Sequence, residues 1–131
     1  GTNPKSRFSC KSGCFSFDVD ENLEAQPLTD GLLVIRHLFG FSGDSLISGA
    51  VDTSAERGTS ELISGYLTDS VSELDIDGDG ESKPLTDGLL LIRYLFGFSG
   101  DSLISGAIGD GAERDTAEEV EAYIKERVPA P

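Results

Sequence analysis

Apolar side chains are concentrated in two similar runs, and the run at 86–96 shows the pattern most clearly. Its sequence, TDGLLLIRYLF, is apolar nearly all round. Three of these residues lie at helical spacing: Leu89, Ile92 and Phe96. Because a helix that is apolar on every side is suited to a core, the run predicts a buried helix. Thr86 or Asp87 is suited to cap its start, and Gly97 to end it.

Amphipathic segments accompany this run. The segment SGDSLISGA at 99–107 predicts a helix cap followed by a short helical turn. The segment at 59–71 carries one apolar stripe: Leu62, Ile63, Tyr66, Leu67 and Val71. The segment at 116–128 begins with a capping box, Thr116 to Glu119, and carries Val120, Tyr123 and Ile124 on its apolar side. Because we find no strand-like alternation of any length, we predict an all-α fold.

The chain contains an internal duplication. Segments 27–51 and 84–108 are identical at 22 of 25 positions, and three pairs differ: Val34/Leu91, His37/Tyr94 and Val51/Ile108. The same offset of 57 residues, from 27 to 84, aligns AER at 55–57 with AER at 112–114. We therefore divide the chain into an N-terminal segment and two repeats: 1–17, 18–71 and 72–131. We expect the repeats to fold about a pseudo-twofold axis, each covering the other's apolar face.

Composition excludes some classes of function. The chain has 131 residues and a formal net charge of −14. Because nucleic-acid affinity depends on Lys and Arg at phosphates, this acidity excludes nucleic acid as a partner. No apolar run reaches about 18 residues, so we expect no membrane insertion.

Two cysteines, Cys10 and Cys14, lie in the segment CKSGC. Zinc usually needs four protein ligands, and the single histidine, His37, lies far along the chain in an apolar run. We therefore predict a disulfide between Cys10 and Cys14, which closes a very short loop and so stabilises the fold only modestly. A disulfide indicates an oxidising compartment and hence a secreted protein.

The acidic segment DIDGDGESKPLTD at 75–87 has the spacing of a calcium loop. Aspartates occupy its first, third and fifth positions, and Gly80 follows at once. Alternate carboxylates can all point inward, while glycine permits a sharp left-handed turn. Ca2+ takes about six to eight oxygen ligands, whereas Mg2+ seldom accepts an all-protein cage. The predicted ligands are Asp75, Asp77, Asp79, the carbonyl of Glu81, and Asp87.

This loop and the helix after it resemble the calcium-binding unit of type I dockerin repeats, which is half of an EF-hand. The resemblance covers about twenty residues in each repeat, DIDGDGESKPLTDGLLLIRY in the second. In that family the unit occurs twice, and an aspartate closes each loop. By position, the resemblance implies a first calcium site held by Asp18, Asp20, Asn22, the carbonyl of Glu24, and Asp30.

The chain departs from the dockerin pattern, so we regard it as an extended variant. Each closing aspartate is the thirteenth loop residue rather than the twelfth, so we expect one residue to bulge near Pro27 and Pro84. Each repeat also carries FGFSGDSLISGA and a tail helix. In the first loop, Leu23 stands where glycine is wanted, and Asn22 replaces an aspartate. We therefore expect the loop at 75–87 to bind Ca2+ more tightly.

Two functions fit these features. The resemblance implies a module of a secreted, polysaccharide-degrading protein that docks onto a cohesin-like partner. The implied partner-binding residues are Arg36, His37, Arg93 and Tyr94. The alternative is a calcium-stabilised spacer or cell-surface module that contacts only neighbouring domains of its own chain. Exposure of those four side chains favours docking, and burial against the tail helices favours the spacer.

We expect no enzymatic activity. Carboxylate pairs hydrolyse glycosides, but nearly every clustered carboxylate here belongs to a calcium loop. The sequence also lacks a Ser-His-Asp set, a cysteine–histidine pair and a phosphate-binding glycine loop. The phenylalanines at 39, 41, 96 and 98 are expected in the core rather than on an aromatic sugar-binding surface.

Overall fold

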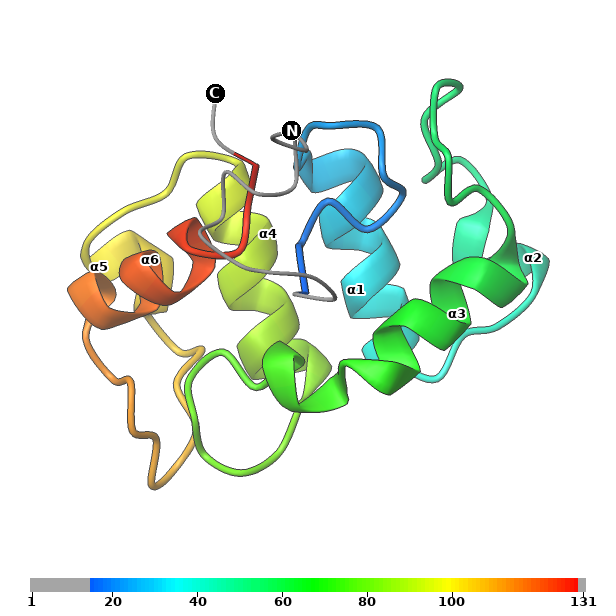
Figure 1. The fold of residues 1–131 in the computed structure, drawn as a ribbon. Coiled ribbons are helices and arrows are strands. Elements are labelled where there is room, and N and C mark those ends of the chain that lie inside the picture. Colours follow the sequence, from blue (N-terminus) through cyan, green and yellow to red (C-terminus); the bar gives the residue numbers. More distant parts are fainter. Residues whose placement is uncertain (1–14, 130–131) are drawn as a thin grey trace, which may run out of the picture.

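The computed structural model describes residues 15–129, and this range is helical with no strand (Figure 1). The all-α class is thereby confirmed. The α-helices are α1 (Leu32–Leu38), α2 (Asp44–Ile47), α3 (Ser60–Asp69), α4 (Leu89–Leu95), α5 (Asp101–Ile104) and α6 (Ala117–Lys125). Two π-helical turns, Pro27–Gly31 and Pro84–Gly88, lead into α1 and α4, and a 3-10 turn, Val71–Leu74, follows α3. The predicted Cys10–Cys14 disulfide lies outside the described residues.

Helices α1 and α4 lie side by side at the centre and run in opposite directions (Figure 1). The start of each helix packs on the other: a Cβ added to Gly31 would lie 3.0 Å from Ile92, and one added to Gly88 would lie 2.8 Å from Ile35. These two contacts join equivalent positions of the repeats, so they are reciprocal. A twofold axis generates contacts of this kind, but the axis itself stays a prediction.

The central helices supply part of the core from equivalent positions: Leu33 and Val34, and Leu90 and Leu91. The prediction that the helix at 86–96 is buried all round is wrong. Leu89 and Ile92 are half-buried, and Phe96 is exposed. The physical reason is size, because a chain this short has too few further helices to enclose the central pair on every side.

The two ends of α4 differ in how well the sequence predicted them. Thr86 and Asp87 do not cap the helix from outside, because both lie inside the π-helical turn that precedes it. The end at Gly97 is confirmed: its φ is 96°, and its N–H donates to the carbonyl of Tyr94 at 2.9 Å. The next N–H, of Phe98, donates to a carbonyl five residues back, which completes a Schellman motif.

Each tail helix packs on the central helix of its own repeat, α3 on α1 and α6 on α4. The capping box from Thr116 to Glu119 is confirmed. The buried residues of the tail helices are Ile63, Leu67, Ala117, Val120 and Ile124. The stripe predicted for 59–71 is too wide, since Leu62 and Val71 are exposed. Helix α3 ends at Asp69, so Val71 no longer follows its buried face.

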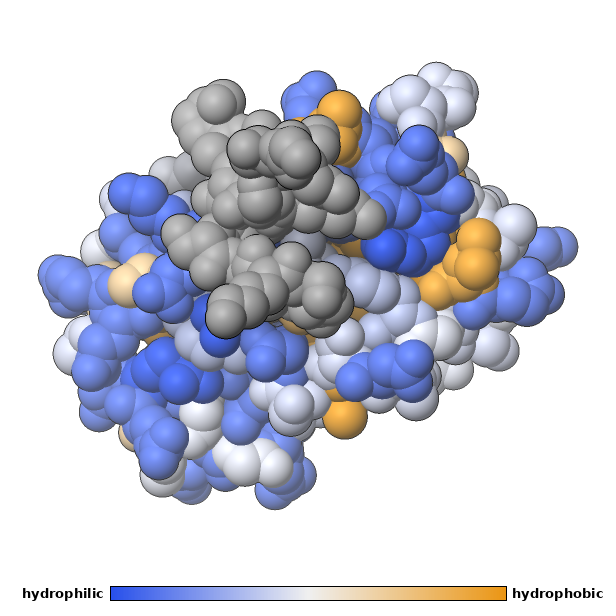
Figure 2. Space-filling view, viewed as in Figure 1, coloured by the Kyte–Doolittle hydropathy of each residue, from blue (hydrophilic) through white to orange (hydrophobic). Residues whose placement is uncertain are grey.

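The phenylalanines that follow the central helices are exposed, so the prediction that they belong to the core is wrong. Phe39, Phe41, Phe96 and Phe98 are 46% to 53% exposed. Each pair flanks a glycine in the left-handed region, Gly40 or Gly97, which reverses the chain at the helix end. On the face drawn in Figure 2, apolar residues form separate patches within a mainly hydrophilic surface.

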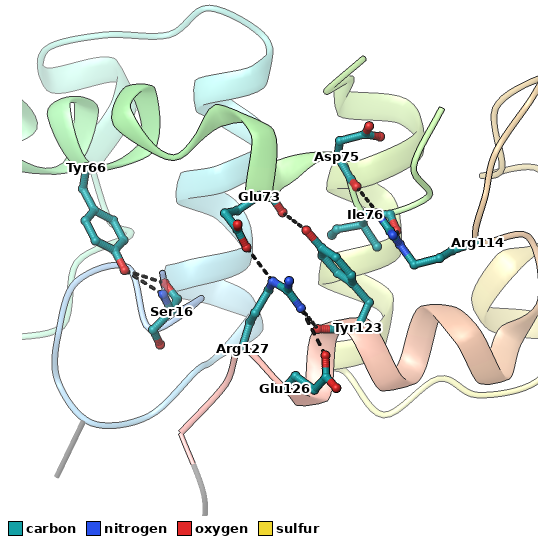
Figure 3. Close-up of polar contacts among 9 residues, drawn as sticks. All are labelled: Ser16, Tyr66, Glu73, Asp75, Ile76, Arg114, Tyr123, Glu126 and Arg127. Carbon is teal, nitrogen blue, oxygen red and sulfur yellow. Dashed lines mark hydrogen bonds and ion pairs between the residues drawn. The ribbon is translucent and has the colours of Figure 1, made fainter. Parts of the chain in front are cut away.

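A tyrosine on each tail helix is hydrogen-bonded to the backbone just before the acidic loop of its repeat. The hydroxyl of Tyr66 donates to the carbonyl of Ser16 at 3.1 Å and accepts the Ser16 N–H at 2.7 Å. The hydroxyl of Tyr123 donates to the carbonyl of Glu73 at 2.9 Å (Figure 3). Ser16 and Glu73 each stand two residues before an acidic loop. The tyrosines therefore fix the chain at the point where it enters each loop.

Candidate metal centres

Each acidic loop gathers its aspartates around one point. One oxygen of every aspartate in a cluster lies within 4.8 Å of those of the others. The clusters are Asp75, Asp77, Asp79 and Asp87 in the second loop and Asp18, Asp20 and Asp30 in the first. All three aspartates of the first cluster are buried, as are two of the second. Both clusters could hold a metal ion, as the loop pattern predicts.

The closing aspartate of each loop lies within a π-helical turn. In this turn, Gly31 donates to the carbonyl of Gln26 at 3.1 Å, and Gly88 donates to that of Lys83 at 3.2 Å. Each bond reaches five residues back instead of four, so the turn holds one residue more than an α-helical turn. This confirms the bulge predicted near the two prolines. It also explains how a thirteenth residue can close a loop of this type.

Backbone N–H groups hold both closing carboxylates, those of Asp30 and Asp87. In each, Oδ2 accepts the N–H of the residue four positions earlier, at 2.8 Å. Oδ1 accepts the N–H of the third loop residue, Asp20 at 3.2 Å or Asp77 at 3.1 Å. Each closing aspartate therefore ties the start of the central helix to the start of the loop.

The two loops turn through the left-handed region at equivalent positions. The second loop uses Gly78 and Gly80, with φ of 69° and 94°, and the first uses Glu21 and Leu23, with φ of 58° and 78°. This conformation costs on the order of 1 kcal/mol or more for a residue other than glycine. The missing glycine predicts the strain at Leu23. The strain at Glu21 was missed, although the glycine at the equivalent position 78 was a usable signal.

Burial makes ionisation unfavourable for the two closing aspartates and for one further aspartate in each cluster. Burial is the largest influence that raises the pKa of Asp30 to about 8 and of Asp87 to about 7, and neighbouring aspartates add to it. Burial also raises the pKa of Asp18 and of Asp77. Within residues 15–129, no ion pair joins these carboxylates to a basic side chain. No described basic side chain therefore neutralises these carboxylates by an ion pair.

One carboxylate oxygen of the first cluster indicates whether a cation would fit among these side chains. Asp20 is fully buried, and its Oδ1 has no hydrogen-bond partner among the described residues. Its Oδ2 accepts the N–H of Asp52 at 2.9 Å. An unpartnered, buried, charged oxygen costs several kcal/mol. A cation among these oxygens would supply the missing partner, and a donor set made only of oxygen suits a hard cation.

The remaining predicted ligands, Asn22, Glu24 and Glu81, are half-buried or exposed, as is Asp79 of the second cluster. The side-chain oxygen of Asn22 accepts the N–H of Glu24 at 3.2 Å, and that of Asp79 accepts the N–H of Glu81 at 3.0 Å. The carboxylates of Glu24 and Glu81 are exposed, and that of Glu81 lies 3.7 Å from the ammonium group of Lys83. These two carboxylates lie outside the clusters, while the prediction for both residues concerns their carbonyl oxygens.

A segment that we call the strap, residues 52–57 in the first repeat and 109–114 in the second, braces each loop. Its arginine donates to a loop carbonyl: Arg57 to that of Val19 at 2.7 Å and Arg114 to that of Ile76 at 2.6 Å. The guanidinium groups also lie 3.7 and 4.1 Å from the ring centres of the tail-helix tyrosines. Figure 3 shows the pair in the second repeat, Arg114 and Tyr123. The sequence shows AER in both straps but does not reveal this bracing role.

The four residues implied in partner binding are half-buried. Arg36 donates to two carbonyls at the end of α2, at 3.0 and 2.8 Å, and Arg93 does the same at the end of α5, at 3.1 and 2.8 Å. Burial lowers the pKa of His37 and raises that of Tyr94. Each guanidinium group is therefore hydrogen-bonded within its own repeat. Partner binding through these residues stays a prediction.

Comparisons with protein-family models, curated proteins and solved structures found no match to this chain. Among the described residues, no helix is long and apolar enough to cross a membrane.

Proposed function

We propose that both acidic loops bind Ca2+. The observation that carries this proposal is the unpartnered, fully buried Oδ1 of Asp20 within a cluster of carboxylates. Ca2+ accepts irregular oxygen cages, whereas Mg2+ demands a near-octahedral one and keeps several waters. The residues that would hold the ions are Asp18, Asp20, Asn22, Glu24 and Asp30, and Asp75, Asp77, Asp79, Glu81 and Asp87.

The bound ion has a structural role in this proposal. It supplies a positive charge among the buried carboxylates, and it joins the start of each loop to the helix that follows. Because this arrangement exists only in the folded chain, the free energy of binding adds to the free energy of folding. Without Ca2+, repulsion within each loop opposes the packing of α1 against α4.

We further propose that the calcium-loaded chain is a dockerin-like interaction module for a cohesin-like domain. The exposed segments 39–45 and 96–102 both read FGFSGDS, whereas segments 52–71 and 109–128 share only seven of 20 residues. Packing does not require exposed residues to be identical in the two repeats. We therefore explain the identity of these two segments by contact with the same partner. Because Arg36 and Arg93 are hydrogen-bonded within their own repeats, we assign the contact with the partner to the exposed phenylalanines of these segments. Aromatic residues often dominate binding energy at interfaces.

A second candidate function is a calcium-stabilised spacer within a longer protein. The internal hydrogen bonds of Arg36 and Arg93 favour it, because they remove two of the four groups that the dockerin resemblance assigns to a partner. In that function the two loops have a purely structural role, and the exposed phenylalanines contact only neighbouring domains.

Calorimetric titration with a panel of purified cohesin domains, in Ca2+ and in chelator, separates the two functions. The docking proposal expects calcium-dependent binding that survives alanine replacement of one phenylalanine pair. Replacement of both pairs, Phe39 with Phe41 and Phe96 with Phe98, should abolish binding with little change in the melting temperature. The matched control replaces Arg36, His37, Arg93 and Tyr94 instead. No binding by any cohesin in Ca2+ supports the spacer.

A further inference from the structure

The two loops differ at their fifth position, and the strap differs at the position that faces it. The fifth residue is Asp79 in the second loop and Asn22 in the first. The facing strap residue is Gly109 in the second repeat and Asp52 in the first. A Cβ added to Gly109 would clash with Oδ2 of Asp79. In the second repeat, the carboxylate of Asp79 would have to move before a side chain could stand at this strap position.

The strap backbone lies in the same place in both repeats. The N–H of Asp52 donates to Oδ2 of Asp20 at 2.9 Å, as the N–H of Gly109 donates to Oδ2 of Asp77 at 2.7 Å. The side chain of Asp52 therefore begins where the second loop has its fifth carboxyl group. Hydrogen bonds from Ser54 lower the pKa of Asp52, and a hydrogen bond from the side chain of Asn22 lowers it by a smaller amount.

We infer that Asp52 is the fourth carboxylate of the first calcium site and replaces the charge lost at Asn22. This inference rests on the proposed binding of Ca2+ by the first loop, for which the unpartnered oxygen of Asp20 is independent support. Asp52 lies outside the tight cluster of three aspartates, next to Asn22. Its carboxylate would therefore attract the ion from the edge of the site. The two sites then carry equal formal charge, with the carboxylate moved from the loop to the strap.

Removal of the charge without a change of shape tests this role. We expect Asp52→Asn to weaken Ca2+ binding by the first loop about tenfold in a calorimetric titration, because the substitution removes a negative charge that attracts the divalent ion. The matched control is Asp110→Asn, which removes an exposed carboxylate from the other strap and should leave both binding steps unchanged.

A double substitution provides the decisive comparison. Asn22→Asp together with Asp52→Gly copies the second site into the first repeat, and it should restore the affinity that Asp52→Gly alone loses. Two unchanged binding steps in Asp52→Asn would overturn the inference and leave the proposed calcium binding intact. If the unaltered protein binds no Ca2+ at the first loop, the proposed function of that loop fails, and the inference fails with it.

Discussion

The two acidic loops follow the same path with different residues. The second loop makes its two left-handed turns at glycines 78 and 80, whereas the first makes them at Glu21 and Leu23. The hydrogen bonds to the closing aspartate and the strap contacts are nevertheless equivalent in both repeats. Glycine therefore lowers the cost of this path but does not define it. The carboxylates and the strap hold the first loop in its strained form.

The loops also differ in how deeply their aspartates are buried. All three clustered aspartates of the first loop are buried, against two of the four in the second, and burial raises the pKa of the closing aspartate in both loops. We expect the second loop to bind Ca2+ more tightly, since its turns are unstrained. Calorimetry should resolve two unequal sites, and Asp75→Ala should destabilise the protein more than Asp18→Ala. A tighter first site would contradict this ranking.

Removal of calcium should have the largest effect. A ligand at 100 times its dissociation constant stabilises a folded protein by about 2.7 kcal/mol, so two filled sites contribute on the order of 5 kcal/mol. We expect chelator to lower the free energy of unfolding by that amount and to reduce the helical circular dichroism signal. Urea unfolding in Ca2+ and in chelator measures it, and equal midpoints would argue against both sites.

Acidification should stabilise the chelated protein by a few kcal/mol. The pKa of Asp30 and of Asp87 is raised above the ordinary value of 3.8, so protonation of these two closing aspartates stabilises the calcium-free fold. Their contribution is complete below about pH 4 and is lost as the pH rises through about 7 at Asp87 and about 8 at Asp30. Urea unfolding in chelator between about pH 4 and 9 measures this loss, which a flat profile would contradict.

The two repeats can also be compared at the glycines where α1 and α4 pack on each other. Gly88→Ala brings a methyl group within 2.8 Å of Ile35, and Gly31→Ala brings one within 3.0 Å of Ile92. Each change should cost about 1 to 3 kcal/mol, with the larger loss at Gly88. The control is Gly65→Ala in α3, which meets no atom within 4 Å and should stabilise the helix by about 0.5 to 1 kcal/mol. Thermal unfolding in Ca2+ ranks the three.

The smallest expected effect concerns the strained turn. Leu23 is 58% exposed, so Leu23→Gly loses little burial and should stabilise the folded protein by about 1 kcal/mol. The reverse change, Gly80→Leu, should destabilise the second loop by a similar amount. Melting temperatures of the two variants measure both effects. No gain in Leu23→Gly would mean that the first loop has relaxed its strain by other means.

The sequence by itself determined the features that depend on local spacing. The capping box at Thr116, the end of α4 at Gly97 and the grouping of the aspartates all follow from residues close together in the chain. The thirteenth position of the closing aspartate likewise required an extra residue, which the π-helical turns contain. These predictions succeed because helix ends and short loops are governed by their own residues.

Only the tertiary structure decided which faces are covered and which distant residues meet. The hydrophobicity of Phe39 and Phe96 suggests a core position, but the small number of helices leaves both exposed. The dockerin resemblance assigns Arg36 to a partner, but its guanidinium group donates to two carbonyls at the end of α2. Asp52 reaches Asp20 across 32 residues of sequence. Contacts of this kind depend on how elements pack, and packing brings together residues that no local pattern relates.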